Sequence, residues 1–257
     1  MEQVLIKTNQ LIKRYGAVPV VKGLNLEVKS GEIFGFLGPN GAGKTTTIKM
    51  LTGLLDPSEG EALICGYDIR KHPIQAKALM AYVPDQPKLY SKVSAREFLH
   101  LIAALYRVPQ DLIKDRAGQL LDIFGLTDRA DELLEGYSHG MRQKVVLAAA
   151  LIHQPKVIFL DEPTVGLDPA SARLLKDILQ EIARQGAAVF VSTHILEIAE
   201  RMCHRVGILK EGLLIAQGSP EELRRKAGQG GESLEDIFLE LTGGHENAEL
   251  IKSLEEG

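Results

Sequence analysis

The sequence has little that would cross-link it or hold it in a membrane. It has no tryptophan and only two cysteines among 257 residues, Cys65 and Cys203. Two cysteines form neither a disulfide framework nor a metal cluster, so we expect buried, reduced thiols, as in a cytosolic protein. The longest apolar run, residues 145–152, is far shorter than the ~20 residues that span a bilayer. The first 16 residues carry early charges and lack the apolar core of a signal peptide.

The chain also lacks a basic surplus. Its 30 Lys and Arg residues face 34 Asp and Glu residues, a formal net charge of −4, so the composition does not favour a nucleic-acid partner. Hydrophobic residues make up 45% and charged residues 25%, as in globular chains that bury a sizeable core. Residues 232–257 hold eight acidic residues and one lysine. We expect a solvated acidic tail there, with a short helix over 233–241.

Strand and helix patterns alternate along the chain, which predicts an α/β architecture with a mainly parallel core sheet. Between about residues 87 and 154 the patterns are almost entirely helical, which predicts a helical subdomain inserted into that core. We expect Asp56-Pro57 to end a helix over 44–55 and a glycine-rich break at 227–231. The other expected strands are 4–12, 20–28, 33–37, 61–65, 156–160, 187–192, 205–209 and 213–217. The other expected helices are 94–106, which a capping box at Ser94 and Glu97 opens, 109–124, 138–153, 168–184 and one capped by residues 219–222.

Residues Gly38–Thr45 match the pattern G-x-x-x-x-G-K-[ST] between an apolar strand and a helix. Glycines let a backbone wrap a phosphate chain with its N–H groups pointing inward, and the helix N-terminus adds partial positive charge. We expect Lys44 to reach the β- and γ-phosphates of a nucleotide and the Thr45 hydroxyl to bind Mg²⁺.

A second motif, Val157–Leu160 followed by Asp161 and Glu162, is an apolar strand that ends in two carboxylates. Ligands of parallel sheets bind at the carboxyl ends of the strands, so Asp161 is placed to hold Mg²⁺. Glu162 is the candidate general base for an attacking water.

With these motifs in this order, the chain resembles the nucleotide-binding subunits of ABC (ATP-binding cassette) transporters from about Leu5 to Leu241. The resemblance implies a P-loop NTPase core of the RecA-like type, with an N-terminal antiparallel β subdomain and the inserted α-helical subdomain. It further implies one ATPase domain over residues 1–231, followed by the acidic tail, 232–257.

Ser138-His-Gly140-Met, preceded by Tyr137, is similar to the family signature, which usually reads Leu-Ser-Gly-Gly-Gln. His139, Met141 and Tyr137 depart from it, whereas Ser138 and Gly140, the positions that touch phosphate in the family, are kept. The resemblance implies that this loop contacts the γ-phosphate held by a second subunit. A serine N-cap and a helix dipole suit such a contact.

Three other positions match the family. Val165–Asp168 has the spacing of the D-loop, which helps to pair two subunits, and Asp168 can also cap the next helix. His194 matches the switch histidine that reaches the γ-phosphate. Tyr15, 23 positions before Gly38, matches the aromatic that stacks on adenine. The resemblance implies catalytic roles for Lys44, Glu162 and His194, and ATP contacts from Tyr15, Gly38, Pro39, Asn40, Gly41, Ala42, Gly43, Lys44, Thr45, Thr46, Ser138 and Gly140.

The family usually places a glutamine after Tyr-x-Pro, where it links Mg²⁺ to the transmembrane partner. Here the run is Tyr82-Val-Pro-Asp85-Gln86-Pro87. Asp85 occupies the expected position and has the charge that Mg²⁺ prefers, while Gln86 keeps the usual residue type. We favour Asp85 by position and keep both as metal ligands.

The resemblance therefore implies a subunit that binds and hydrolyses MgATP as a head-to-tail homo- or heterodimer. It would power export through a separate permease at the cytoplasmic face of the membrane, docking through residues 87–95 with Leu89 and Tyr90 as candidate contacts. The signature, the Tyr-Val-Pro-Asp run and the tail are most similar to bacterial exporters of the drug and antibiotic efflux type. Three alternatives stay open: an importer ATPase, a soluble ABC ATPase acting on ribosomes or DNA, and a weakly hydrolysing regulatory subunit.

Overall fold

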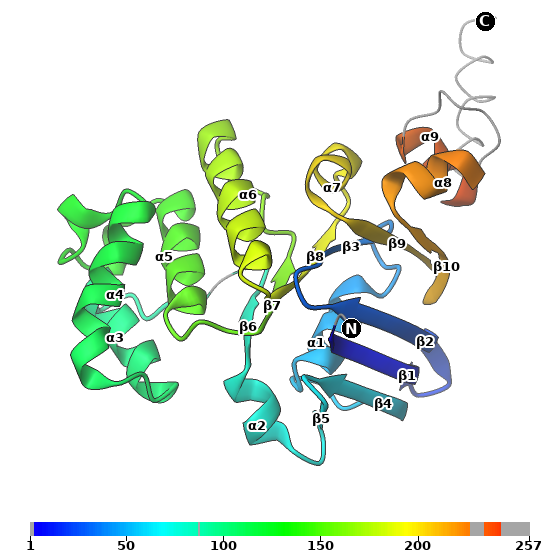
Figure 1. Ribbon diagram of the computed structural model, residues 1–257, viewed down its shortest axis with the longest axis horizontal. Helices are drawn as coiled ribbons and strands as arrows, with labels where there is room; N and C mark the ends of the chain where they lie inside the picture. Colours follow the sequence, from blue (N-terminus) through cyan, green and yellow to red (C-terminus); the bar gives the residue numbers. More distant parts are fainter. Residues whose placement is uncertain (1–2, 87, 227–233, 243–257) are drawn as a thin grey trace, which may run out of the picture.

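A computed structural model describes residues 3–86, 88–226 and 234–242 and centres on a six-stranded sheet (Figure 1). In spatial order its strands are β10 (Leu213–Gly218), β9 (Arg205–Lys210), β3 (Ile33–Leu37), β8 (Ala188–Thr193), β7 (Val157–Asp161) and β6 (Met80–Val83). All neighbours pair in parallel except β10, which is antiparallel to β9. The predicted α/β fold with a mainly parallel core sheet is confirmed.

A second, antiparallel sheet lies toward the N-terminal part of the chain and confirms the expected β subdomain. Its order is β2 (Val18–Lys29), β1 (Val4–Tyr15), β4 (Glu59–Ile64) and β5 (Tyr67–Asp68). The first strand runs three residues beyond the predicted end. Gln10 takes a left-handed φ of 47° at one of the shifts in the register with β2, the register shifts again between Lys13 and Arg14, and pairing continues as far as Tyr15.

Among the described residues, three α-helices lie between β6 and β7 in the chain and form the inserted helical subdomain, at the left of Figure 1. Ser94 and Glu97 form the predicted capping box at the start of the first. The three are α3 (Ala95–Leu105), α4 (Gln110–Ile123) and α5 (His139–Leu151). The remaining helices are α1 (Lys44–Leu51), α2 (Pro73–Ala78), α6 (Pro169–Arg184), α7 (Leu196–Met202), α8 (Pro220–Lys226) and α9 (Leu234–Thr242).

The prediction that α1 continues to residue 55 was wrong, because a glycine ends it earlier. Gly53 adopts φ +65°, and the N–H groups of Leu54 and Leu55 turn back to donate to the Lys49 carbonyl at 2.9 and 3.0 Å. The short elements β5, β6, α2 and α7 were not predicted. The expected helix over 233–241 corresponds to α9, whereas the break at 227–231, Pro87 and tail residues 243–257 lie outside the described residues.

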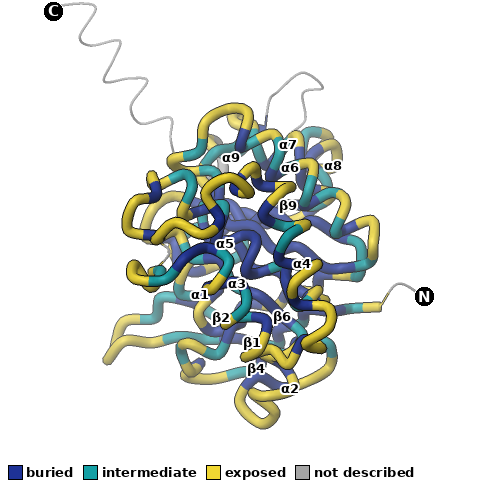
Figure 2. The backbone as a smooth tube through the Cα atoms, turned by 90° about the vertical axis from the view of Figure 1, so that its left-hand side faces the viewer, coloured by how far each residue is buried: buried dark blue, intermediate teal, exposed yellow. Residues whose placement is uncertain are grey.

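The central sheet separates two apolar clusters. Phe34 and Phe36 point to the side of α1 and the antiparallel sheet, while Ile33 and Leu37 point to the side of α3–α6. Figure 2 shows this sheet as the buried centre of the molecule. Phe190 of β8 anchors the first cluster, with ring centroids 5.7, 5.2 and 5.7 Å from those of Phe34, Phe36 and Phe159.

Both cysteines are free thiols, but only Cys203 is buried and Cys65 is half-buried, so the prediction of burial was wrong for Cys65. In the described ranges no helix has the length and apolarity needed to cross a membrane.

We predict that Phe190→Ala lowers the free energy of unfolding by about 3–5 kcal/mol, because it removes a fully buried ring that three other rings contact. Urea denaturation followed by circular dichroism measures this loss. Leu54→Ala is the control, since that side chain is 62% exposed and should cost less than about 1 kcal/mol. Equal losses for the two variants would contradict this account of the core.

Candidate functional site

The loop between β3 and α1 fits closely against the strands around it. A Cβ on Gly38 would lie 2.5 Å from the Leu209 carbonyl oxygen, and one on Gly43 would lie 2.9 Å from the Val20 carbonyl oxygen. Gly43 also has φ +107°, in the left-handed region that favours glycine. These two glycines therefore let the loop form a compact cradle directly before the N-terminus of α1.

The Lys44 side chain lies inside this cradle. Its Nζ donates to the carbonyl oxygens of Gly38 at 2.6 Å and Pro39 at 3.3 Å, and it lies 3.8 Å from Glu162 Oε1. Burial lowers the pKa of Lys44, while the Glu162 and Asp161 carboxylates oppose that shift. The ammonium is thus held toward the carboxyl end of β7.

Asp161 is the last residue of β7 and is buried. Its carboxylate accepts a 2.5 Å hydrogen bond from the Ser192 hydroxyl of β8, which satisfies one oxygen of a group that would be costly to bury alone. Ser192 also fixes the neighbouring backbone, because its carbonyl accepts from the Glu162 N–H at 3.1 Å. One serine therefore orients both acidic residues.

Glu162 follows Asp161 and turns its carboxylate toward the ends of two other strands. The residue has φ +50°, a left-handed conformation that non-glycine residues seldom adopt. Its Oε2 lies 2.9 Å from Nδ1 of His194 and also accepts from the His194 N–H at 3.4 Å. The Glu162 side chain is 14% exposed and that of His194 is 51% exposed, so the pair opens to solvent on the histidine side.

The fold thus brings Lys44, Asp161, Glu162 and His194 to one edge of the sheet. Thr45 is exposed and Thr46 half-buried at the start of α1, beside Lys44. The exposed residues Asn40 and Gly41 form the outer turn of the loop, and Pro39 and Ala42 complete it.

Ser138 and Gly140 are not part of this assembly. Ser138 caps α5 by accepting from the Met141 N–H at 3.3 Å, and α5 packs against β6. In the sheet, β6 lies three places from β3, a separation on the order of 14 Å at the usual strand spacing. The start of α5 is therefore remote from the cradle of its own chain (Figure 1).

Asp85 and Gln86 follow β6 and are exposed. Burial raises the pKa of the Tyr82 hydroxyl to about 12, with further contributions from the Asp161 and Asp85 carboxylates. Both carboxylates therefore act on the same phenol, and Asp85 leaves the sheet beside β7, because Val83 of β6 pairs in parallel with Leu160 of β7.

Tyr15 ends β1 with its side chain 53% exposed. It pairs with Val18 at the end of the β1–β2 hairpin, and the Lys13 ammonium lies 5.4 Å from its ring centroid. Val20, two residues beyond Val18, is the residue whose carbonyl faces Gly43. An exposed aromatic ring thus stands at the hairpin end nearest the cradle.

Sequence reasoning missed Ser192 and Gln143. Ser192 lies beside Thr193 at the end of a strand that is otherwise apolar and fully buried, and a hydroxyl at such a position needs a partner, which was the available signal. Gln143 is also fully buried and donates to the Pro163 carbonyl at 2.8 Å. Its partner is distant in sequence, so no local pattern indicated it.

The oxygen donors that this site offers, those of Thr45 and Asp161, would bind Mg²⁺ only together with phosphate oxygens. Across residues 3–86, 88–226 and 234–242, no group of three or more His, Cys, Asp or Glu residues could hold a metal ion. Thr45 and Asp161 offer hard oxygen donors next to a glycine cradle, and Mg²⁺ commonly takes one or two protein oxygens with phosphate oxygens and water.

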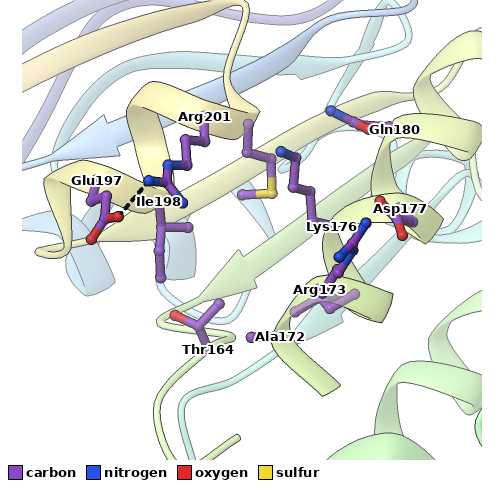
Figure 3. A pocket seen from close by; sticks show the side chains of 11 residues that line it. Thr164, Ala172, Arg173, Lys176, Asp177, Gln180, Glu197, Ile198 and Arg201 are labelled. Atoms are coloured by element: carbon purple, nitrogen blue, oxygen red, sulfur yellow. Dashed lines mark ion pairs between the residues drawn. The ribbon is translucent and has the colours of Figure 1, made fainter. Parts of the chain in front are cut away.

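A separate cavity of about 490 Å³ lies between α6 and α7 (Figure 3). Arg173 and Lys176 line one side, and Arg201 pairs with Glu197 on the other. Thr164 connects this cavity to the loop after Glu162, but its lining residues include none of the four groups that meet at the sheet edge.

Known proteins are similar to this chain over most of its length. The family described as ABC transporter matches residues 21–165. The linearmycin resistance ATP-binding protein LnrL of Bacillus subtilis is 37% identical over 93% of this chain and 75% of its own length. The Nod factor export ATP-binding protein I of Ralstonia nicotianae is 37% identical over 85% and 68%. A solved structure of an ATP binding subunit of an ABC transporter is 35% identical, with a TM-score of 0.88 over 92% of this chain and 99% of that one.

We predict that Ser192→Ala weakens Mg²⁺-dependent ATP binding and lowers the free energy of unfolding by about 1–3 kcal/mol, because the buried Asp161 carboxylate loses a donor. Calorimetric titration and urea denaturation measure the two effects. Thr52→Ala is the matched control, since it removes a buried hydroxyl that bonds only to carbonyls of its own helix. If both variants keep wild-type affinity, Ser192 does not orient the acidic pair.

Proposed function

This chain belongs to the ABC transporter family as an ATP-binding subunit, and from that premise we propose that it hydrolyses MgATP as a head-to-tail dimer to power export through a separate transmembrane permease. Membership of the ABC ATPase family implies ATP hydrolysis. The pairing, the residue roles, the permease and the direction of transport are our proposal, argued from the residues below.

The position of Glu162 carries the proposal. Its carboxylate lies between the Lys44 ammonium, at 3.8 Å, and the His194 imidazole, at 2.9 Å, at the edge where parallel sheets bind ligands. There it orients an attacking water and accepts its proton. Lys44 stabilises the negative charge of the transferred phosphoryl group, and His194 donates to the γ-phosphate.

The cradle from Gly38 to Thr46 binds the phosphate chain through its backbone N–H groups and the N-terminus of α1. The exposed Tyr15 ring stacks on the adenine base. Thr45 and Asp161 would hold Mg²⁺, with Asp85 or Gln86 as a further ligand from the loop after β6. Bound there, the ion would supply positive charge to the phosphate chain.

Two copies are needed to complete the site. Within one chain, Ser138 and Gly140 stand at the start of α5, a helix that packs against β6, and β6 lies three places from β3 in the sheet. In a head-to-tail pair, the α5 N-terminus of one copy faces the nucleotide of the other, and its dipole and free N–H groups suit the γ-phosphate. The same contacts are available to a homodimer or to a similar partner chain. The D-loop, Val165–Asp168, lies beside this junction.

The loop that follows β6 is the proposed permease contact, which places the subunit at the cytoplasmic face of the membrane. In segment 87–95, Leu89 packs against the apolar cluster of the helical subdomain, and Tyr90 is 65% exposed with its ring 6.3 Å from that of Phe98. Pro87 lies outside the described residues. A cavity of about 210 Å³, lined in part by Lys88 and Phe98, adjoins the segment, and a helix of the permease would bind there through apolar contacts.

The direction of transport that we propose is export. It is supported by the relatives described as a resistance protein and an export protein.

We predict that Glu162→Gln keeps ATP binding, lowers hydrolysis by at least about 100-fold and traps an ATP-dependent dimer, because the amide retains the shape but cannot accept the proton. Steady-state kinetics and size-exclusion chromatography with MgATP test this. Glu197→Gln, an exposed carboxylate on α7, is the control and should behave as wild type. Absence of a dimer together with wild-type hydrolysis would refute the assignment of the base.

For the loop after β6, Asp85→Ala should reduce Mg²⁺-dependent turnover more than Gln86→Ala does. Asp85 follows β6, which pairs in parallel with the strand that ends in Asp161, and it is the better Mg²⁺ ligand by charge. Turnover measured across a Mg²⁺ titration for both variants gives the ranking. The reverse ranking would assign the metal contact to Gln86.

A further inference from the structure

The first turn of α5 packs against the loop that follows Glu162. A Cβ built on Gly166 would lie 2.8 Å from Cδ2 and 3.0 Å from Nε2 of His139, and it would meet no other atom within 4 Å. The edge of the imidazole therefore occupies the place where a side chain at 166 would stand. Because the rest of the His139 side chain lies farther away, an alanine at 139 would leave that place open.

A second contact lies one helical turn further along the same face of α5. The Gln143 amide nitrogen donates to the Pro163 carbonyl at 2.8 Å, and the whole side chain is buried. Pro163 is the residue directly after Glu162. Helix α5 thus touches the loop at both ends, through a hydrogen bond near Glu162 and through a ring contact at Gly166.

The loop itself is short and internally bonded. The Val165 N–H donates to the Glu162 carbonyl at 3.2 Å, and the Leu167 N–H donates to the Thr164 carbonyl at 3.2 Å. At the far end the Asp168 carboxylate accepts two hydrogen bonds, of 2.9 and 2.7 Å, from the first turn of α6. The loop thus consists of two consecutive turns followed by the capped start of α6. Because these bonds connect its residues closely, a displacement of Gly166 also moves Glu162.

We propose that His139 is a positioning residue, which holds Gly166 in place and through the loop sets the Glu162 carboxylate between Lys44 and His194. This inference rests on the proposed function, in which the start of α5 faces the nucleotide of the second copy. A contact made there with the neighbour's nucleotide then also adjusts the hydrolytic carboxylate of the same chain. The large ring at 139 and the missing side chain at 166 are complementary, so each residue requires the other.

A double-mutant cycle on ATP hydrolysis tests the pair, using the full chain with His139→Ala, Gly166→Ala and both together. In the wild-type background Gly166→Ala both strains a backbone at φ +80° and collides with the ring. In the His139→Ala background only the strain remains. We expect a coupling of about tenfold in kcat, with KM for ATP nearly unchanged because ground-state binding is not altered.

His139→Ala alone provides a test that does not require Gly166→Ala to fold. It should lower kcat about fivefold with little change in KM, and His139→Gln should restore part of the loss by placing a planar group over Gly166. Gly66→Ala is the matched control for backbone strain, since Gly66 has φ +84° and nothing within 4 Å of its would-be Cβ. It should keep the wild-type kcat.

Two results would overturn the inference: an equal effect of Gly166→Ala with and without the imidazole, or an unchanged kcat in His139→Ala. The dimer trapped by Glu162→Gln separates this failure from that of the proposed function. If the trapped dimer forms while the double-mutant cycle shows no coupling between His139 and Gly166, only the proposed role of His139 is wrong. If no dimer forms and wild-type hydrolysis persists, the proposed pairing itself is wrong.

Discussion

The parallel pairing of β8 with β3 on one side and β7 on the other is the constraint on which the site depends. All six residues of β8 are buried, and Phe190 contacts rings from both neighbouring strands. A slip of one residue would turn Phe190 out of its cluster and Ser192 away from Asp161, so the register is strongly specified. The lysine, the two carboxylates and the imidazole meet because the segments that carry them leave neighbouring strands at one edge.

The two most deeply buried charges at this edge, Lys44 and Asp161, are satisfied without pairing with each other, although Lys44 Nζ lies 3.8 Å from Glu162 Oε1. Lys44 and Asp161 are 7% and 2% exposed, and ions buried this deeply are costly unless they are hydrogen-bonded. Lys44 bonds to backbone carbonyls of its own loop and Asp161 to a serine hydroxyl. Because they do not form a direct ion pair, the cation and the anion each keep bonding capacity for a phosphate and a metal ion. The arrangement is stable in the chain alone and complementary to a charged ligand.

The sequence predicted what depends on neighbouring residues. The glycine-rich loop before α1, the acidic strand end and the capping box at Ser94 are local patterns, and their elements lie where expected. What it missed depends on distant contacts or on single backbone angles. Ser192 meets Asp161 only through strand pairing, and Gln143 meets its carbonyl only through packing of α5. Gly53 ends α1 through its φ angle, before the proline that was expected to do so.

The central sheet also separates the packing of its two faces. The apolar cluster around α3–α6 and the cluster around α1 lie on opposite faces and do not share side chains. A substitution in the apolar core of α3 or α4 is therefore absorbed by repacking on its own face, whereas the first turn of α5 reaches the loop that follows Glu162. The two halves can diverge at different rates during evolution. A surface on α3 or α4 can be reshaped for a new neighbour while the chemistry at the strand ends stays the same.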